Sequence, residues 1–96
     1  MTDEVLQGLI AEVKTFLKIT WSDERTDNEV KTLVKEADHY LKEKVGVEEI
    51  SYTNDLSAKS ILKEYCRYVY NYSLEYFEEN FKSLIWGLIL KYASNE

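Results

Sequence analysis

The chain has 96 residues, of which 45% are hydrophobic and 31% charged, and it contains three glycines and no proline. This length and composition predict one helical domain over residues 1–96 with a single core, and they argue against a proline-rich linker or a disordered tail. A formal charge of −6 without any cluster of Lys or Arg excludes the electrostatic footprint of a sequence-specific DNA-binding protein.

The first predicted helix covers Asp3–Lys18, with acidic residues in its first turn and with Thr2 or Asp3 as its N-cap. Gly8 lies inside this helix, where we expect an exposed position rather than a close contact between helices. The apolar residues recur at spacings of three and four and form one stripe: Leu6, Leu9, Ile10, Val13, Phe16 and Leu17.

A polar loop, residues 19–27, follows and is anchored by Ile19 and Trp21. Thr26 and Glu29 form a capping box, which predicts that the second helix begins there. Gly46 is expected to end this helix in the left-handed conformation. The predicted core stripe between these two signals is Val30, Leu33, Val34, Ala37, Leu41 and Val45.

The connection from residue 47 to residue 55 has apolar residues at Val47, Ile50 and Tyr52, which we expect to contact the core. Asn54 or Asp55 is the expected N-cap of the next helix.

The stretch Leu56–Phe77 is the most apolar part of the chain, and we predict that it forms one long central helix. Its stripe is Ala58, Ile61, Leu62, Tyr65, Cys66, Val69, Ser73 and Phe77, and further tyrosines widen it. Residues 68–72 also alternate as in a β-strand. The helix is favoured because helix-forming residues flank this segment and no turn signal separates them.

The last predicted helix starts after Asn80, a candidate N-cap, and its core stripe is Leu84, Ile85, Leu88, Ile89 and Tyr92. Trp86 and Leu90 lie on a different face, which is either internal or a docking surface. The sequence therefore predicts an all-α protein, a small bundle of about four helices around one long central helix.

Residues suited to catalysis are few. His39 is the only histidine and Cys66 the only cysteine, so a zinc site or a catalytic triad lacks its ligands or partners. Cys66 is expected to be a small buried hydrophobic residue, and it cannot form an internal disulfide. We therefore expect a protein that is not an enzyme and has no metal or cofactor.

The chain begins without the basic and apolar segments of a signal peptide, so we expect synthesis in the cytoplasm. Its longest apolar run, residues 84–90, is far shorter than the roughly 20 residues that cross a bilayer, so no membrane contact is expected.

Aromatic residues are the unusual feature, with five tyrosines between Tyr65 and Tyr76. Tyrosine is enriched at protein interfaces because it combines apolar area with a hydroxyl group that tolerates partial contact with water. Some of these tyrosines are expected to fill the edge of the core. The candidate interface residues are Trp21, Tyr68, Tyr72, Tyr76, Trp86 and Leu90.

The order of these elements resembles the small head-tail connector proteins of long-tailed phages, also called head-completion or DNA-packaging adaptor proteins. Two segments carry the resemblance. Residues 13–46 (VKTFLKITWSDERTDNEVKTLVKEADHYLKEKVG) follow the pattern of helix, acidic loop, helix and glycine. Residues 61–81 (ILKEYCRYVYNYSLEYFEENF) look like the family's long helix with an aromatic end.

The resemblance implies a structural protein of the virion, located at the junction of head and tail. Such connectors assemble as a dodecameric head-to-tail ring on the portal protein and extend the DNA channel. They also bind a stopper or tail-completion protein. DNA would pass through the lumen without sequence-specific binding, and an acidic wall suits this passage.

A head-to-tail ring needs two different surfaces on each subunit. From the sequence we assign one surface to Tyr68, Tyr72 and Tyr76, and the other to the first helix or the loop 19–27. Trp86 and Leu90 would contact the portal or the next ring. The alternative function is a small acidic helical regulator that binds another protein, similar to an anti-repressor or an antitoxin.

Overall fold

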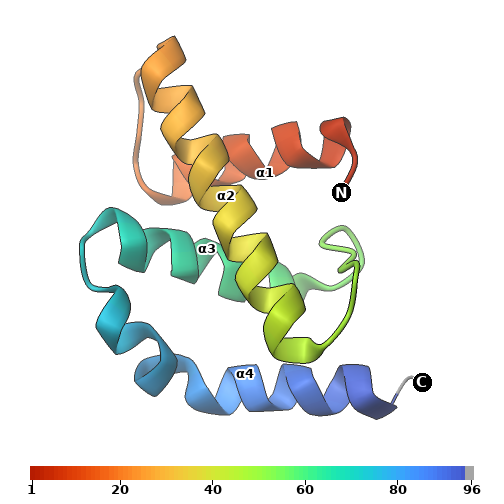
Figure 1. Cartoon of the computed structure of the whole chain (residues 1–96). Coiled ribbons are helices and arrows are strands. Elements are labelled where there is room, and N and C mark those ends of the chain that lie inside the picture. The colour runs from red at the N-terminus through yellow and green to blue at the C-terminus, as the bar shows by residue number, and fades with distance from the viewer. Residues whose placement is uncertain (95–96) are drawn as a thin grey trace.

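The structure, a computed structural model, describes residues 1–94 and is built from helices (Figure 1). The elements are α1 (Asp3–Phe16), α2 (Glu24–Val45), α3 (Leu56–Tyr70), a short 3-10 helix η1 (Leu74–Tyr76) and α4 (Phe77–Ser94). The prediction of a small all-α bundle is confirmed. Within the described residues no strand is present, so the alternative strand over residues 68–72 is wrong.

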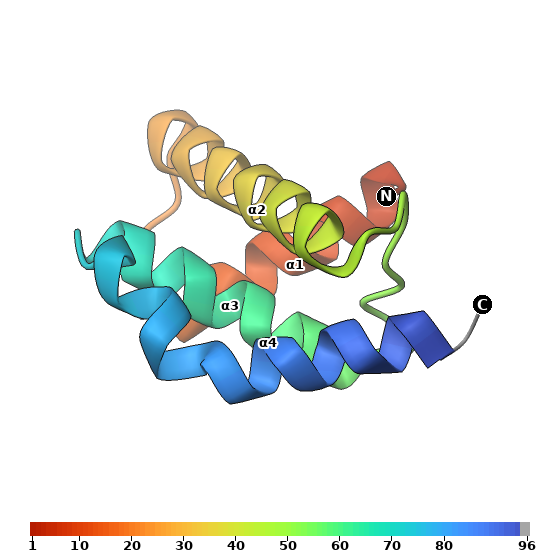
Figure 2. The ribbon, with the colours of Figure 1, turned by 60° about the horizontal axis from the view of Figure 1, so that its bottom comes forward.

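The helices are arranged around α2 and α3, each of which contacts all the other α-helices. In Figure 1, α1 lies toward the top and α4 along the bottom, with α3 between them, and α2 crosses α1 and α3 and ends next to α4. The turned view in Figure 2 also places α3 between α1 and α4. Among residues 1–94, α1 and α4 make no contact with each other, so they form opposite sides of the bundle.

The single core draws residues from every α-helix and from the connection between α2 and α3. Ile50 and Tyr52 of this connection are buried and Val47 is partly buried, as the sequence predicts. Phe77 is fully buried, and its ring lies within 6 Å of the rings of Tyr40, Tyr65, Tyr68 and Phe81. This aromatic cluster joins α2, α3 and α4.

The prediction of one unbroken helix over Leu56–Phe77 is wrong, because α3 ends at Tyr70. Tyr72 adopts a left-handed conformation with φ of 56°. The amide of Tyr72 donates to the carbonyl oxygen of Val69, and the amide of Ser73 donates to that of Tyr68. These two bonds form a Schellman motif, which normally has glycine at the left-handed position. The longest helix is therefore α2, with 22 residues against 15 in α3.

The start of α2 also differs from the prediction. The helix begins one turn before the expected capping box, with Asp23 as its N-cap. The carboxylate of Asp23 accepts a hydrogen bond from the amide of Thr26 and another from its hydroxyl group. Thr26 therefore lies within the first turn and donates to the N-cap residue, so it is not the N-cap. The C-terminal prediction is confirmed, since Gly46 is left-handed with φ of 73°.

The N-cap predictions for the remaining helices had mixed outcomes. Thr2 caps α1 and Asp55 caps α3, which confirms one of the two alternatives in each case. Asn80 is not a cap, because α4 begins at Phe77 and continues through it. The side-chain amide of Asn80 instead donates to the hydroxyl group of Tyr68, across the contact between α3 and α4.

Helix α1 ends at Phe16, two residues earlier than predicted, and Lys18 follows in a left-handed conformation. Within residues 1–94, no helix has the length and apolar character needed to cross a membrane.

Candidate interaction surface

The candidate residues from the sequence occupy several separate parts of the surface. Trp21, Tyr72, Tyr76, Trp86 and Leu90 are exposed large apolar side chains, whereas Tyr68 is partly buried. Because the chain turns after Tyr70, Tyr68 does not share one helix face with Tyr72 and Tyr76. The predicted tyrosine surface on one long helix therefore does not form.

Tyr68 belongs to the packing between α3 and α4. Its ring contacts Phe77 and Phe81 edge-on, with ring centroids 5.7 and 5.6 Å away, and its hydroxyl group accepts the bond from Asn80 at 2.9 Å. These contacts hold the side chain on the bundle rather than present it to another molecule.

Helix α4 is apolar on two sides. Its inner side contributes Phe77, Ile85 and Leu88 to the core. Its exposed side, which we call the α4 outer face, consists of Ser83, Leu84, Trp86, Gly87 and Leu90; Trp86 and Leu90 are one turn apart, and Leu84 lies on the opposite flank of this face. Leu84, Trp86 and Leu90 expose 59%, 60% and 52% of their surface. The prediction that Leu84 lies in the core is wrong. The side of α4 that contacts the bundle is centred on Ile85, Leu88 and Tyr92, and Leu84 lies at its margin.

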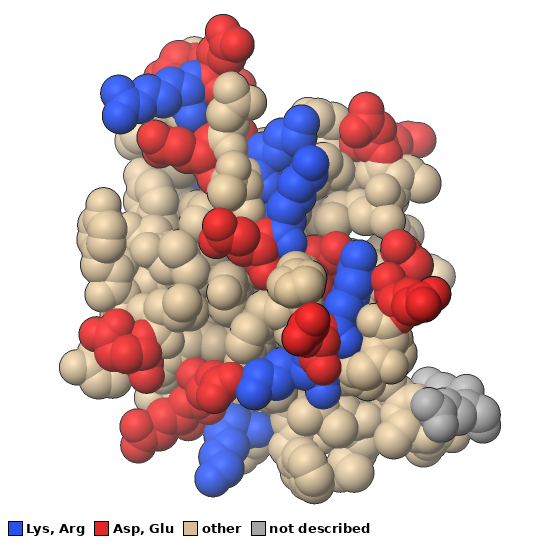
Figure 3. Space-filling view, viewed as in Figure 1, with Lys and Arg blue, Asp and Glu red and all other residues tan. Residues whose placement is uncertain are grey.

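The charges along α4 are segregated. Glu78 and Glu79 lie in its first turn, and between Asn80 and Ser94 the only charged residues are Lys82 and Lys91. Figure 3 has the view of Figure 1, so α4 lies along its lower edge. This edge is largely uncharged, and its charged side chains gather near one end. In a chain with a net charge of −6, this segment is an exception that combines apolar area with positive charge.

The turn between α3 and α4 forms a second exposed apolar surface, which we call the aromatic turn: Tyr70, Tyr72, Leu74 and Tyr76. Tyr72 is its most exposed member, with 93% of its surface accessible. Left-handed backbone costs roughly 1–2 kcal/mol for an L-residue with a side chain. The Tyr72 ring therefore contributes almost nothing to the packing of residues 1–94.

The position of α4 is fixed by Asp55, the N-cap of α3. Its carboxylate accepts hydrogen bonds from the amide of Ala58 at 3.0 Å, from Lys91 Nζ at 2.9 Å and from the Tyr92 hydroxyl group at 2.9 Å. Burial works to raise the pKa of Asp55, but these three donors outweigh it and lower the pKa below its ordinary value of 3.8. The ionised carboxylate thus ties the last turn of α4 to the first turn of α3.

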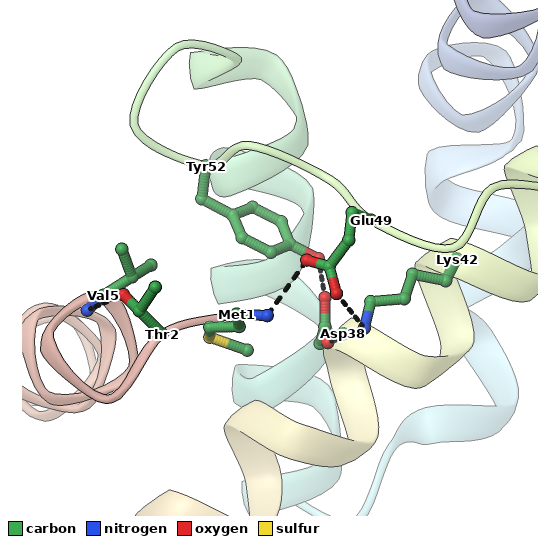
Figure 4. A network of polar contacts seen from close by, with 7 residues as sticks. All are labelled: Met1, Thr2, Val5, Asp38, Lys42, Glu49 and Tyr52. Carbon is green, nitrogen blue, oxygen red and sulfur yellow. Dashed lines mark hydrogen bonds and ion pairs between the residues drawn. The ribbon is translucent and has the colours of Figure 1, made fainter.

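A polar network on the other side of the core holds the connection between α2 and α3 (Figure 4). The hydroxyl group of buried Tyr52 donates to Asp38 Oδ1 at 2.7 Å, and Lys42 Nζ lies 2.8 Å from Asp38 Oδ2. The amino group of Met1 donates to Glu49 Oε2 at 2.9 Å, which brings the start of α1 to the same place. Asp38 is thus a buried charge with a cation and a hydroxyl donor as partners.

The side of the bundle where α2 faces α3 and α4 has two shallow hollows that share Tyr40 and Lys44. The Tyr40 hydroxyl group donates to Glu78 at 2.6 Å, and Lys44 Nζ lies 2.7 Å from the same oxygen. Burial and the neighbouring Glu78 raise the pKa of Tyr40. Glu78 is therefore paired with Lys44 and bonded to Tyr40 where the two hollows meet.

Of the two residues suited to chemistry, Cys66 is buried, as the sequence predicts. His39 is exposed on α2, with Glu43 as its ion-pair neighbour at 3.5 Å. Cys66 is fully buried, and burial raises the pKa of its thiol to about 12, so the reactive thiolate is suppressed. Among residues 1–94, no three His, Cys, Asp or Glu side chains gather as a metal site would require.

Comparison with known proteins adds no relative: no family model, curated protein or solved structure matches the chain.

Sequence reasoning missed three features of this surface: the exposure of Leu84, the aromatic turn as a separate element, and the role of Asp55 in holding α4. Leu84 lies at the margin between the two sides of α4, so helical spacing does not separate it from the core. The other two features depend on a left-handed tyrosine and on long-range contacts, which leave no local sequence signal.

Proposed function

We propose that this protein is a structural assembly protein that acts by self-association, as a head-tail connector of a long-tailed phage. The observation that carries the proposal is the α4 outer face, where Trp86 and Leu90 are exposed one turn apart and Leu84 is exposed on the flank of the same helix. Large contiguous apolar surface on a soluble domain marks a site of protein contact. Trp and Tyr are also the residues that most often dominate the energy of such contacts.

A connector ring needs two different contact surfaces between neighbouring subunits, and further surface for its partners above and below. The bundle offers the α4 outer face and the aromatic turn as separate apolar regions. In the proposed assembly about twelve copies form the ring on the portal protein, and a stopper or tail-completion protein binds the opposite rim. The aromatic turn, which extends from the bundle, is a suitable contact for one of these partners.

The net charge of −6 supports a passive role toward DNA. A wall rich in carboxylates repels phosphate groups, so DNA would slide through the ring without being held. Sequence-specific recognition would need a basic surface. The described surface mixes both signs, and the segment of α4 with only positive residues contains just two of them.

Native mass spectrometry of the purified protein, alone and with the candidate portal protein, tests the proposal. We expect a closed ring of about twelve copies, formed either alone or on the portal. Trp86→Asp should prevent assembly while the helical circular dichroism signal stays unchanged. Leu56→Asp is the matched control, because Leu56 is also a large exposed apolar residue but lies at the start of α3.

A stable closed dimer that ignores the portal at every concentration would contradict the proposal. That result would favour the alternative, a small acidic regulator that binds one partner protein. The two functions thus differ in a directly measurable property, the symmetry of the complex.

A further inference from the structure

We infer that the α4 outer face of one copy docks into a groove along α1 of the next copy, which gives the head-to-tail contact of the assembly. This inference rests on the proposed self-association and deepens it by naming both surfaces. It also replaces the sequence-based assignment of Trp86 and Leu90 to the portal.

The receiving groove lies between α1 and α3. Two hollows that share Glu12 follow this boundary, and they are lined by Glu4, Val5, Gly8, Leu9, Glu12, Tyr52, Thr53 and Lys59, and by Ala11, Glu12, Thr15, Phe16 and Lys63. We call them together the α1 groove. From Glu4 to Phe16 the groove follows α1 for about 18 Å, at 1.5 Å per residue. The α4 outer face, from Ser83 to Leu90, is about 11 Å long and fits within this length.

The two surfaces have complementary shapes. The α4 outer face projects large side chains, Leu84, Trp86 and Leu90. The small residues Gly8, Ala11 and Thr15 of α1 lie along the α1 groove among larger and charged ones, and a Cβ atom added at Gly8 would meet no atom within 4 Å. Large apolar side chains packed into hollows beside small residues exclude water efficiently, as the centre of a stable interface requires.

The charges are also complementary. Lys82 borders the α4 outer face, and Lys91 near it is already bound to Asp55 at 2.9 Å, whereas the first turn of α1 carries Asp3 and Glu4. Glu12, in the middle of the groove, already lies 3.1 and 3.4 Å from two lysines of its own chain. The electrostatic attraction between copies therefore depends mainly on the first turn of α1. Lys59 and Lys63 also line the groove, but both are paired with Glu12, whereas two α4 outer faces that met would bring lysines together.

The positions of the two surfaces favour a chain of contacts over a closed pair. Helices α1 and α4 form opposite sides of the bundle, separated by α3 (Figure 1). A copy that docks its α4 outer face still presents its own α1 groove to a third copy. Such heterologous contacts repeat until they close as a ring.

Complementary blocking variants test this arrangement. The first, Trp86→Asp with Leu90→Asp, blocks the α4 outer face. The second, Gly8→Arg with Ala11→Arg, blocks the α1 groove, and arginine is an excellent helix former, so α1 should stay folded. Circular dichroism and urea denaturation verify the fold of each. Each variant alone should be monomeric by analytical ultracentrifugation. An equimolar mixture should form a one-to-one dimer and no larger species, because only one good pair of surfaces remains.

Several results would overturn the inference. If two α4 outer faces bind each other in an isologous contact, the variant with the blocked α1 groove would be as oligomeric as the wild type. Mixing would then not restore assembly of the variant with the blocked α4 outer face. A wild type that stays monomeric at about 1 mM would contradict self-docking with a useful affinity. Ring formation on the portal by the second variant would disprove the α1 groove while leaving the proposed function intact.

Discussion

Helices α2 and α4 are the two longest in the molecule, yet they relate to solvent in opposite ways. Helix α2 buries Val30, Val34, Ala37 and Leu41 on one side and covers its other side with charged and polar residues. Helix α4 buries Phe77, Ile85 and Leu88 and leaves further large apolar residues on its outer face. The exposed side of α2 is polar and is well solvated by water, whereas the exposed side of α4 is apolar and is suited to contact with protein. Substitutions on α2 should therefore affect folding, and those on the outside of α4 should affect assembly.

The largest expected effect separates the two sides of α4. Phe77→Ala should lower the free energy of unfolding by about 3–5 kcal/mol, because it empties the centre of the aromatic cluster. Trp86→Ala, measured where the protein is monomeric, should change it by less than about 0.5 kcal/mol. Urea denaturation followed by circular dichroism measures both. Equal losses would show that Trp86 supports the monomer and would break the distinction between the two sides.

On the α2 side, Tyr52→Phe removes the hydroxyl group that donates to buried Asp38. A hydrogen bond to a charged group contributes about 1.5–3 kcal/mol, so we expect a loss of that size in urea denaturation. Tyr76→Phe is the matched control, because Tyr76 is exposed and its change should be close to zero. A similar loss in both variants would contradict the role of Asp38 as a buried partner.

Asp55 should make the attachment of α4 dependent on pH. Its pKa is lowered in the folded protein, so its stabilising contribution is complete above the unfolded value near 3.8 and is lost as the pH falls through the folded value. Asp55→Asn keeps an N-cap residue but removes the charge that binds Lys91. The variant should be about 1–2 kcal/mol less stable at pH 7. This difference should shrink below pH 4 in thermal denaturation, and a constant difference would contradict the assignment.

The smallest effects concern glycines of the two helices. Gly46 ends α2 with φ of 73°, so Gly46→Ala should destabilise the protein by about 1 kcal/mol. Gly87 lies in the middle of α4 with open space around it, so Gly87→Ala should stabilise the monomer by about 0.5–1 kcal/mol. Thermal denaturation of the two variants should therefore shift in opposite directions. A loss at Gly87 would reveal a close contact inside the monomer.

The sequence predicts the fold class, most core residues, the end of α2 at Gly46 and the N-caps of α1 and α3. Gly46 and Asp55 are the residue types that such positions prefer. The errors at the ends of α1 and α3 share one cause. Lys18 and Tyr72 occupy left-handed positions after α1 and α3, and neither residue type signals a helix end. Long-range contacts in the folded chain determine those turns, and they also determine which tyrosines are buried.

The surfaces were less predictable than the fold. Helical spacing separated Trp86 and Leu90 from the core, and both are exposed. It did not separate Leu84, which lies at the margin between the two sides of α4. The grouping of Tyr68 with Tyr72 and Tyr76 depended on a continuous helix, so the turn after Tyr70 removed its basis.

The burial of Cys66 provides an internal reporter of unfolding. It is the only cysteine in the chain, it is shielded from solvent, and its raised pKa keeps the sulfur protonated. Alkylating reagents should therefore reach it only when the bundle opens. When reclosing is faster than labelling, the labelling rate gives the free energy of that opening. Because α3 lies at the centre of the molecule, one thiol can report how assembly stabilises the whole bundle, without any added probe.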